Sequence, residues 1–290
     1  MKDDLTAVPP TRAERTLTVH APSASGLPPL RPYARDFWRR RPFMWHLART
    51  ELKATHYNTF LGQVWLVLDP LLMAAIYFML RSVVRPVGSD FDRNRIIAHL
   101  ITGVMVYRYT SSAMGNGARS ITGNSQMVLN TSFPRAIFPV VAVIGVTLEF
   151  LPMIVMMLVT QLALGQPFGP ALLFLPLVFT ILAVFNMGLA MLVAPAMVLF
   201  RDTSGFLPYI SQSWLYASPV LYTIAEIPPN LLPYLRWNPL FPTFAALEEI
   251  FSGQAPSLSN IVFAAIWAAL FFVAGTTIFL RTEPDFAARL

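Results

Sequence analysis

Six long apolar stretches dominate this chain of 290 residues, and each is long enough for a helix that crosses ~30 Å of hydrocarbon. Lipid offers backbone groups no hydrogen-bond partner, and the stretches lack the ~10-residue alternation of barrel strands, so we expect helices. The sequence therefore predicts an all-α membrane protein with six transmembrane helices. The predicted spans are Phe60 to Leu80, Ile96 to Gly117, Ile137 to Leu164, Ala171 to Phe200, Phe206 to Tyr222 and Ile261 to Leu280.

The composition and the charge distribution of the chain are those expected of a protein embedded in a membrane. Hydrophobic residues make up 55% of the chain and charged residues 12%, which excludes an ordinary water-soluble fold. Of the 21 Lys and Arg residues, 15 lie with both termini on one side of the predicted spans, five lie on the other side, and Arg108 lies within a span. The positive-inside rule therefore predicts cytoplasmic termini, and it explains the net charge of +6 without a nucleic-acid partner. The absence of cysteine excludes disulfides and thiolate metal sites.

The chain divides into three predicted regions. Residues 1–32 are rich in Pro, Ser and Thr and are expected to form a disordered cytoplasmic tail. Residues 33–59 are basic and aromatic and predict an amphipathic helix at the cytoplasmic membrane interface, with a solvated basic linker as the alternative. Residues 60–290 form the transmembrane domain. Its segment 223–258 is apolar but interrupted by prolines, and it is expected to form two short re-entrant helices on the external side.

Three charged residues lie within the predicted spans, namely Asp69, Arg108 and Glu149. A charge at the bilayer centre costs ~2.5–3.5 kcal/mol on insertion scales, so each of the three is a functional candidate. They either pair with one another and lock the helices together, or they line a translocation path.

A polar and aromatic run around Arg108 is too hydrophilic for a lipid-facing surface and is expected to line an interior cavity. Aromatic rings there would stack on sugar faces and let a carbohydrate slide; an interfacial aromatic belt is the alternative. The candidate translocation-path residues are Tyr77, Tyr107, Arg108, Tyr109, Trp214, Tyr216 and Tyr222.

The sequence predicts no catalytic or metal site and no cofactor bound by this chain. It has no phosphate-binding loop pattern, and Lys2 and Lys53 are its only lysines. Its four histidines lack metal-ligand spacing. Glu248 and Glu249 are adjacent on an expected helix, so their side chains diverge by ~100°.

Four motifs, in order along the chain, resemble the ABC-2 type permeases that export polysaccharides, lipopolysaccharide O-antigens and teichoic acids. They are Arg49-Glu51-Leu52-Lys53 with Leu61-Gly62-Gln63-Val64-Trp65 and Pro70; Asn124, Leu129 and Asn130 with Phe133-Pro134-Arg135, Ile137 and Pro139; Arg201-Asp202; and Ser218-Pro219-Val220 with Tyr222, Asn238 and Pro239. The resemblance extends from about Tyr33 to the C-terminus.

The resemblance implies a half-channel in the bacterial inner membrane that pairs with a second copy of itself. It also implies two copies of a separate ATPase subunit, which would hold Mg-ATP and dock on a cytoplasmic coupling loop at residues 118–136. A simple helix start is the alternative for residues 133–135. The implied coupling residues are Asn124, Leu129, Asn130, Phe133, Pro134, Arg135, Arg201 and Asp202.

Exporters of this family carry glycans on a lipid such as polyprenyl diphosphate, so cations near the cytoplasmic boundary are candidate phosphate ligands, with ordinary lipid headgroups as the alternative. These cations are Arg39, Arg40, Arg41, Arg49 and Lys53. Heavy use of Arg over Lys hints at a GC-rich genome and an actinobacterial cell-wall galactan. The other functions considered are an ABC-2 exporter of drugs or small lipids and an integral membrane prenyl-phosphate enzyme, which would need clustered acids for Mg²⁺.

Overall fold

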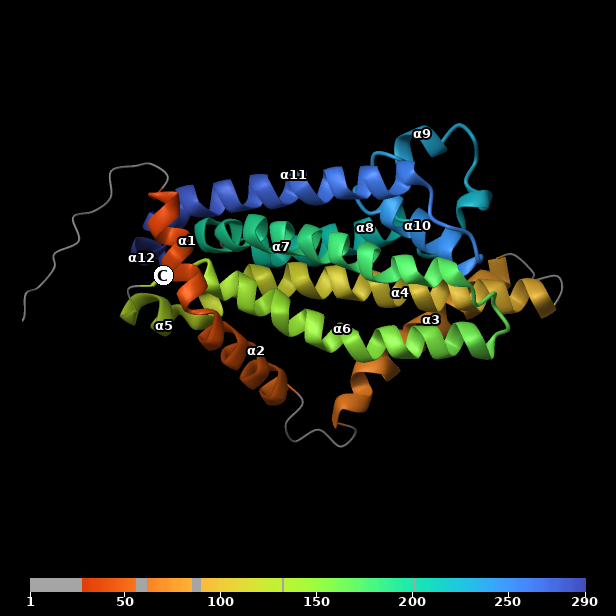
Figure 1. Ribbon diagram of the computed structural model, residues 1–290, viewed down its shortest axis with the longest axis horizontal. Coiled ribbons are helices and arrows are strands. Elements are labelled where there is room, and N and C mark those ends of the chain that lie inside the picture. Colours follow the sequence, from red (N-terminus) through yellow and green to blue (C-terminus); the bar gives the residue numbers. More distant parts are fainter. Residues whose placement is uncertain (1–27, 56–61, 85–89, 132, 201) are drawn as a thin grey trace, which may run out of the picture.

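The computed structural model describes residues 28–55, 62–84, 90–131, 133–200 and 202–290, so most of the predicted tail lies outside the described residues. Every regular element in these ranges is a helix (Figure 1), which confirms the predicted all-α class. The elements are α1 (Leu30–Arg39), α2 (Arg41–Thr55), η1 (Gly62–Val64), α3 (Trp65–Val84), α4 (Asp90–Arg119), η2 (Thr122–Asn124), α5 (Ser125–Asn130), α6 (Ile137–Ala163), η3 (Pro170–Phe174), α7 (Leu175–Leu199), α8 (Thr203–Ala217), η4 (Ile224–Glu226), α9 (Leu232–Leu235), α10 (Phe241–Phe251), α11 (Leu258–Thr282), η5 (Glu283–Asp285) and α12 (Phe286–Arg289).

Within the described ranges, four helical segments are long and apolar enough to cross a membrane: Trp65–Val83, Ile137–Ala163, Pro170–Leu199 and Leu258–Arg289. The other two predicted spans correspond to α4 and α8. α4 has 30 residues, but its first turns are charged and polar. α8 has 15 residues, or about 22 Å at ~1.5 Å per residue, which is short for a membrane span.

The long helices form one bundle in which α7 packs along α11 and α4, and α4 also packs on α6 and α3. The approach of α7 and α11 is close because both carry glycine at the crossing. A Cβ added at Gly275 would lie 2.1 Å from the carbonyl oxygen of Gly188. Small residues at such crossings let two membrane helices bring their backbones into van der Waals contact.

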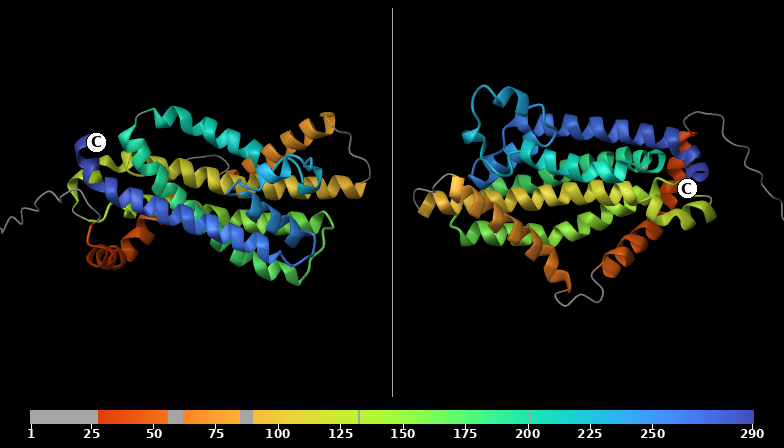
Figure 2. Two further views of the ribbon diagram at one scale, coloured as in Figure 1. Left: turned by 90° about the horizontal axis from the view of Figure 1, so that it is seen from above. Right: turned by 180° about the vertical axis from the view of Figure 1, so that it is seen from behind.

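The two ends of the bundle differ. Figures 1 and 2 show α1, α5, α12 and the C-terminus gathered at one end, and α9 and α10 at the opposite end. We refer to these as the α5 end and the α10 end. Between α8 and α11 the chain forms short helices, and α10 is almost entirely buried.

The predicted interface region forms two helices. α1 ends at Arg39 and α2 begins at Arg41, so Pro42 lies in the first turn of α2, where its missing N–H is tolerated. Met44 and Ala48 on α2 are buried against α6. Arg41 and Arg49 on the same helix are exposed, so α2 is amphipathic.

Candidate functional site

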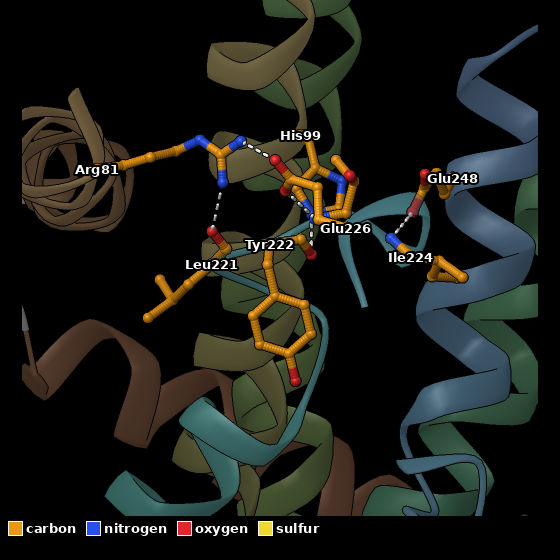
Figure 3. A network of polar contacts seen from close by, with 8 residues as sticks. Arg81, His99, Leu221, Tyr222, Ile224, Glu226 and Glu248 are labelled. Atoms are coloured by element: carbon orange, nitrogen blue, oxygen red, sulfur yellow. Dashed lines mark hydrogen bonds and ion pairs between the residues drawn. The ribbon is translucent and has the colours of Figure 1, made fainter. Parts of the chain in front are cut away.

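At the α10 end, side chains of α3, α4 and α10 hold the segment that follows α8 (Figure 3). Arg81 on α3 donates hydrogen bonds to the carbonyl oxygen of Leu221 at 3.3 Å and to Glu226 Oε1 at 2.5 Å. His99 Nε2 on α4 lies 3.1 Å from the carbonyl oxygen of Tyr222. Glu248 on α10 accepts a hydrogen bond from the backbone N–H of Ile224 at 3.2 Å. Four elements that are distant in sequence are therefore tied together here.

Glu226 is strongly biased toward its charged form. Burial by itself raises the pKa of this carboxyl, but the hydrogen bond and charge of Arg81 and the backbone N–H of Thr223 outweigh burial and lower the pKa to about 2. Neither Arg81 nor Glu226 was among the site residues predicted from the sequence. The signal was present in the sequence between the first two predicted spans, where four arginines, Arg81, Arg85, Arg93 and Arg95, are accompanied only by Asp90 and Asp92.

Asn238 fastens the end of α8. Its amide nitrogen donates to the carbonyl oxygen of Ala217 and to Ser218 Oγ, both at 2.9 Å, and its amide oxygen accepts from Trp214 Nε1 at 2.8 Å. Within this motif, Ser218 and Asn238 therefore have a structural role: their hydrogen bonds hold the end of α8 against the segment before α10.

The predicted path residues fall into two groups. Tyr77 of α3 lies close to Tyr107 and Arg108 of α4 and to Tyr216 of α8. Tyr107 on α4 donates to the carbonyl oxygen of Ser211 on α8 at 2.5 Å. Tyr222 lies at the α10 end of this group, where its hydroxyl donates to the carbonyl oxygen of Tyr216 at 3.2 Å.

The second group packs against α6 and α7, whereas Tyr107, which is also buried, packs toward α8. Tyr109 stacks on Phe150 with ring centroids 4.4 Å apart and shares a hydrogen bond with Thr147 on α6. Trp214 packs edge-on against Phe185 of α7 at 6.0 Å. Tyr109 follows Tyr107 by two positions, and residues at that spacing occupy different faces of a helix.

Of the three charged residues predicted within spans, two form a pair and the third lies elsewhere. Arg108 forms an ion pair with Asp69 of α3, and both side chains are about two-fifths exposed. Glu149 on α6 instead lines a cavity of about 170 Å³ at the α5 end, together with Glu51 of α2 and the polar side chains Asn116 and Arg119 of α4. Burial raises the pKa of Glu51. Glu51 was not among the site residues predicted from the sequence.

The predicted coupling loop projects at the α5 end. Leu129 and Asn130 close α5 and are exposed, Leu129 by 51%, whereas Phe133 packs inward against Phe43 of α2 with ring centroids 5.7 Å apart. Asn124 donates from its amide to the carbonyl oxygen of Ser120 at 3.0 Å and so shapes the turn before α5.

The remaining coupling candidates lie close to the ends of helices. The carbonyl oxygen of Pro134 accepts a hydrogen bond from Ile137 N–H at 3.2 Å, in the turn that precedes α6. Asp202 is exposed, and its carbonyl oxygen accepts from Gly205 N–H at 3.0 Å at the start of α8. Arg201 lies outside the described residues.

Arg135 is engaged by the C-terminal segment. Its backbone N–H donates to Glu283 Oε1 at 2.7 Å, and its guanidinium donates to the carbonyl oxygen of Glu283 at 2.5 Å. Tyr33 of α1 donates to Glu283 Oε2 at 2.7 Å. Burial and the Glu283 carboxylate raise the pKa of Tyr33, so its hydroxyl stays protonated and remains a donor. We call these three residues the C-terminal latch; neither Tyr33 nor Glu283 was predicted as a site residue.

The candidate phosphate-binding arginines of α1 and α2 are all exposed: Arg39, Arg40, Arg41 and Arg49. Several also lie over aromatic rings. The guanidinium of Arg40 is 4.7 Å from the ring centroid of Phe133, and that of Arg49 is 4.7 Å from Trp45. Such contacts orient a cation while leaving its N–H groups available to anions. Lys53 belongs to α2, and its side chain lies outside the described part of the chain.

The fold and these sites define a class: a multi-pass helical membrane protein with an exposed loop at one end and a tethered segment at the other. Comparison with known proteins gives the family. The sequence profile of the ABC-2 type transporter family matches residues 43–252. The chain therefore belongs to this family and is a multi-pass protein of the bacterial inner membrane, as the resemblance in the sequence predicted.

Curated relatives match over nearly their whole length. The chain is 27% identical over 258 residues to the O-antigen export system permease protein RfbA of Myxococcus xanthus, covering 87% of this chain and 97% of that one. Two proteins of the same name from Klebsiella pneumoniae are each 25% identical over 244 residues, covering 83% of this chain and 92% of theirs.

Proposed function

We propose that this chain is the transmembrane subunit of an ATP-driven exporter that moves a polysaccharide from the cytoplasm across the inner membrane. The observation that carries the proposal is the similarity to proteins named O-antigen export permeases, over 87% of this chain and 97% of the relative. Matching over almost the full length of both proteins includes the cytoplasmic loop and the external segment, so it favours a shared kind of cargo over a shared bundle alone.

In the proposed topology, α3, α4, α6, α7 and α11 cross the membrane, and so does α8 together with residues 218–222 that follow it. The α5 end is cytoplasmic, and the short helices at the α10 end re-enter the outer leaflet. A second copy of the chain would complete the conduit. Two separate ATPase subunits with bound Mg-ATP would supply the energy. Support for a docking surface comes from Leu129 and Asn130, which are exposed on α5 at the end where α1 and the C-terminus also lie.

The proposed cargo is a glycan on polyprenyl diphosphate. Its diphosphate would meet the exposed arginines Arg39, Arg40, Arg41 and Arg49 at the cytoplasmic boundary, where Arg binds phosphate oxygens in a bidentate way. The glycan would pass the group formed by Tyr77, Tyr107, Arg108 and Tyr216, which combines aromatic rings with a guanidinium group. A drug or small-lipid cargo is the second candidate, because the ABC-2 family match alone does not fix the cargo.

Proteoliposomes test the proposal directly. The chain is reconstituted with its candidate ATPase, lipid-linked glycan is supplied on the ATPase side, and the glycan that reaches the opposite side is cleaved by a glycosidase that cannot cross the membrane. ATP-dependent cleavage is the expected result. Glycan transport by the chain without any ATPase, or ATP-dependent movement of small lipids but not of the glycan, would overturn it.

A variant of the predicted coupling loop provides a second test. Asn130→Ala should uncouple ATP hydrolysis from glycan movement, because Asn130 is exposed on the proposed docking surface. Asn230→Ala, at an exposed position just before α9 at the other end of the bundle, is the matched control and should transport normally.

A further inference from the structure

A large cavity of about 1390 Å³ opens at the α10 end between α9, α10 and α11. Its volume exceeds the ~300–1,000 Å³ of typical small-molecule pockets. The wall along α11 is apolar, and its residues Phe263, Ile266 and Leu270 are each more than half exposed. The cavity therefore offers a long hydrophobic surface that no described part of the chain covers.

Measured from the start of α11, the apolar wall is long enough to reach the middle of a bilayer. Leu270 lies twelve residues after Leu258, where α11 begins, which is about 18 Å along the helix at ~1.5 Å per residue. Half of a ~30 Å hydrocarbon core is ~15 Å. A hydrocarbon chain fits this wall, because the hydroxyl groups of a glycan would find no hydrogen-bond partner along Phe263, Ile266 and Leu270.

The polar rim of the cavity carries two arginines and two glutamates. Glu248 accepts from the N–H of Ile224, and Glu249 accepts from Ser257 N–H at 2.7 Å and from Asn260 Nδ2 at 3.1 Å, so both carboxylates are engaged by the protein itself. Arg95 and Arg236 also line the cavity and are exposed.

These two arginines stand apart from the carboxylates. Among the side chains that the structure describes, neither Arg95 nor Arg236 forms a hydrogen bond or an ion pair. Trp237 at the rim is 76% exposed, and tryptophan is enriched at the level of lipid headgroups. Free guanidinium groups beside an interfacial tryptophan complement an anionic headgroup.

We propose that this cavity is a binding site for an anionic phospholipid of the leaflet at the α10 end. Its phosphate binds Arg95 and Arg236, and an acyl chain lies along Phe263, Ile266 and Leu270. Bound lipid would connect α9 and α10 to α11 and so stabilise the segment that α3 and α4 hold from the other side. Naming that leaflet the outer one depends on the proposed topology, whereas the choice of lipid class does not.

Quenching of tryptophan fluorescence by brominated lipids tests the site. Trp267 lines the cavity, so its emission, taken as the difference between the protein and Trp267→Phe, reports only lipid at this position. In detergent micelles, phosphatidylglycerol with brominated acyl chains should quench this emission at about tenfold lower mole fraction than phosphatidylcholine with the same chains. Arg95→Gln/Arg236→Gln should remove the preference, whereas Arg95→Lys/Arg236→Lys should keep it. Arg281→Gln, an exposed position at the far end of α11, is the control and should also keep it.

Several results would overturn the proposal. They are equal quenching by the two lipids, a preference that survives Arg95→Gln/Arg236→Gln, and displacement of brominated lipid by a soluble oligosaccharide or by inorganic phosphate but not by unlabelled phosphatidylglycerol. If the double Gln variant fails to fold, the lipid preference of the unmodified protein decides alone. The assay contains neither ATP nor an ATPase, so its outcome is independent of the proposed transport function.

Discussion

Replacing Gly275 with alanine should loosen the contact between α7 and α11. The added Cβ would lie 2.1 Å from the carbonyl oxygen of Gly188 and 3.2 Å from the backbone nitrogen of Leu192. Carbon and oxygen atoms in contact are ~3.3 Å apart. The two backbones must therefore separate by about 1.2 Å, the difference between 2.1 Å and that contact distance. Backbone cannot rotate away as a flexible side chain can.

A gap of ~0.5–1 Å already forfeits a quarter to a half of the dispersion energy of each contact across it. Overpacking in protein cores usually costs ~1–3 kcal/mol, and we expect Gly275→Ala to fall in that range. Gly145→Ala is the matched control, because Gly145 is also in a long membrane helix and its added Cβ would meet nothing within 4 Å.

The measurement is thermal unfolding of both variants in the same detergent, followed by size-exclusion chromatography of the remaining folded protein. Gly275→Ala should lower the midpoint temperature, while Gly145→Ala should leave it unchanged or raise it slightly through better helix propensity. Equal midpoints for the two variants would refute the close packing of α7 on α11.

Three further predictions concern the charged and polar contacts. Because the pKa of Glu226 is lowered to about 2, its stabilisation is complete above its ordinary pKa of ~4.5 and is lost as the pH falls toward 2. The midpoint difference between the protein and Glu226→Gln should thus be constant from pH 8 to 5 and shrink below pH 4.5; a difference that already shrinks between pH 8 and 6 would contradict it. Tyr33→Phe removes a partly buried donor to Glu283 and should cost ~1–3 kcal/mol in unfolding assays. Tyr234→Phe, at a side chain that is 76% exposed, should be neutral; equal effects would argue against the C-terminal latch. Arg108→Leu leaves Asp69 without its partner and should reduce membrane protein level and export; Asp69→Leu/Arg108→Leu should restore the level but not export, and full export by the double variant would assign the pair a structural role only.

Sequence periodicity and hydropathy could predict the helices, because a long apolar run in lipid has one way to satisfy its backbone. They predicted six spans of similar length and hydropathy, whereas α8 is short and α4 begins with polar turns. The break before α2 followed from Pro42 alone.

Contacts between distant segments could not be predicted in the same way. Glu283 meets Tyr33 across 250 positions, and no local pattern encodes that pairing. The sequence could not tell that Tyr107 and Tyr109 have different neighbours. Tyr107 contacts α8 and Tyr109 contacts α6, and this depends on how those helices pack around α4. A pair between Asp69 and Arg108 was foreseen as one alternative, whereas the placement of Glu149 beside Glu51 required the position of α2.

Cross-linking at the α5 end tests the central claim most directly, namely that this chain is driven by a separate ATPase through its cytoplasmic loop. The chain has no cysteine, so Leu129→Cys and Leu231→Cys each create a single reactive thiol, on positions that are 51% and 48% exposed at opposite ends of the bundle. In intact cells, Leu129→Cys should be inaccessible to an impermeant thiol reagent and should cross-link to the ATPase subunit, while Leu231→Cys should be labelled from outside and form no cross-link. Labelling of Leu129→Cys from outside, or cross-linking of the ATPase at Leu231→Cys, would contradict the account.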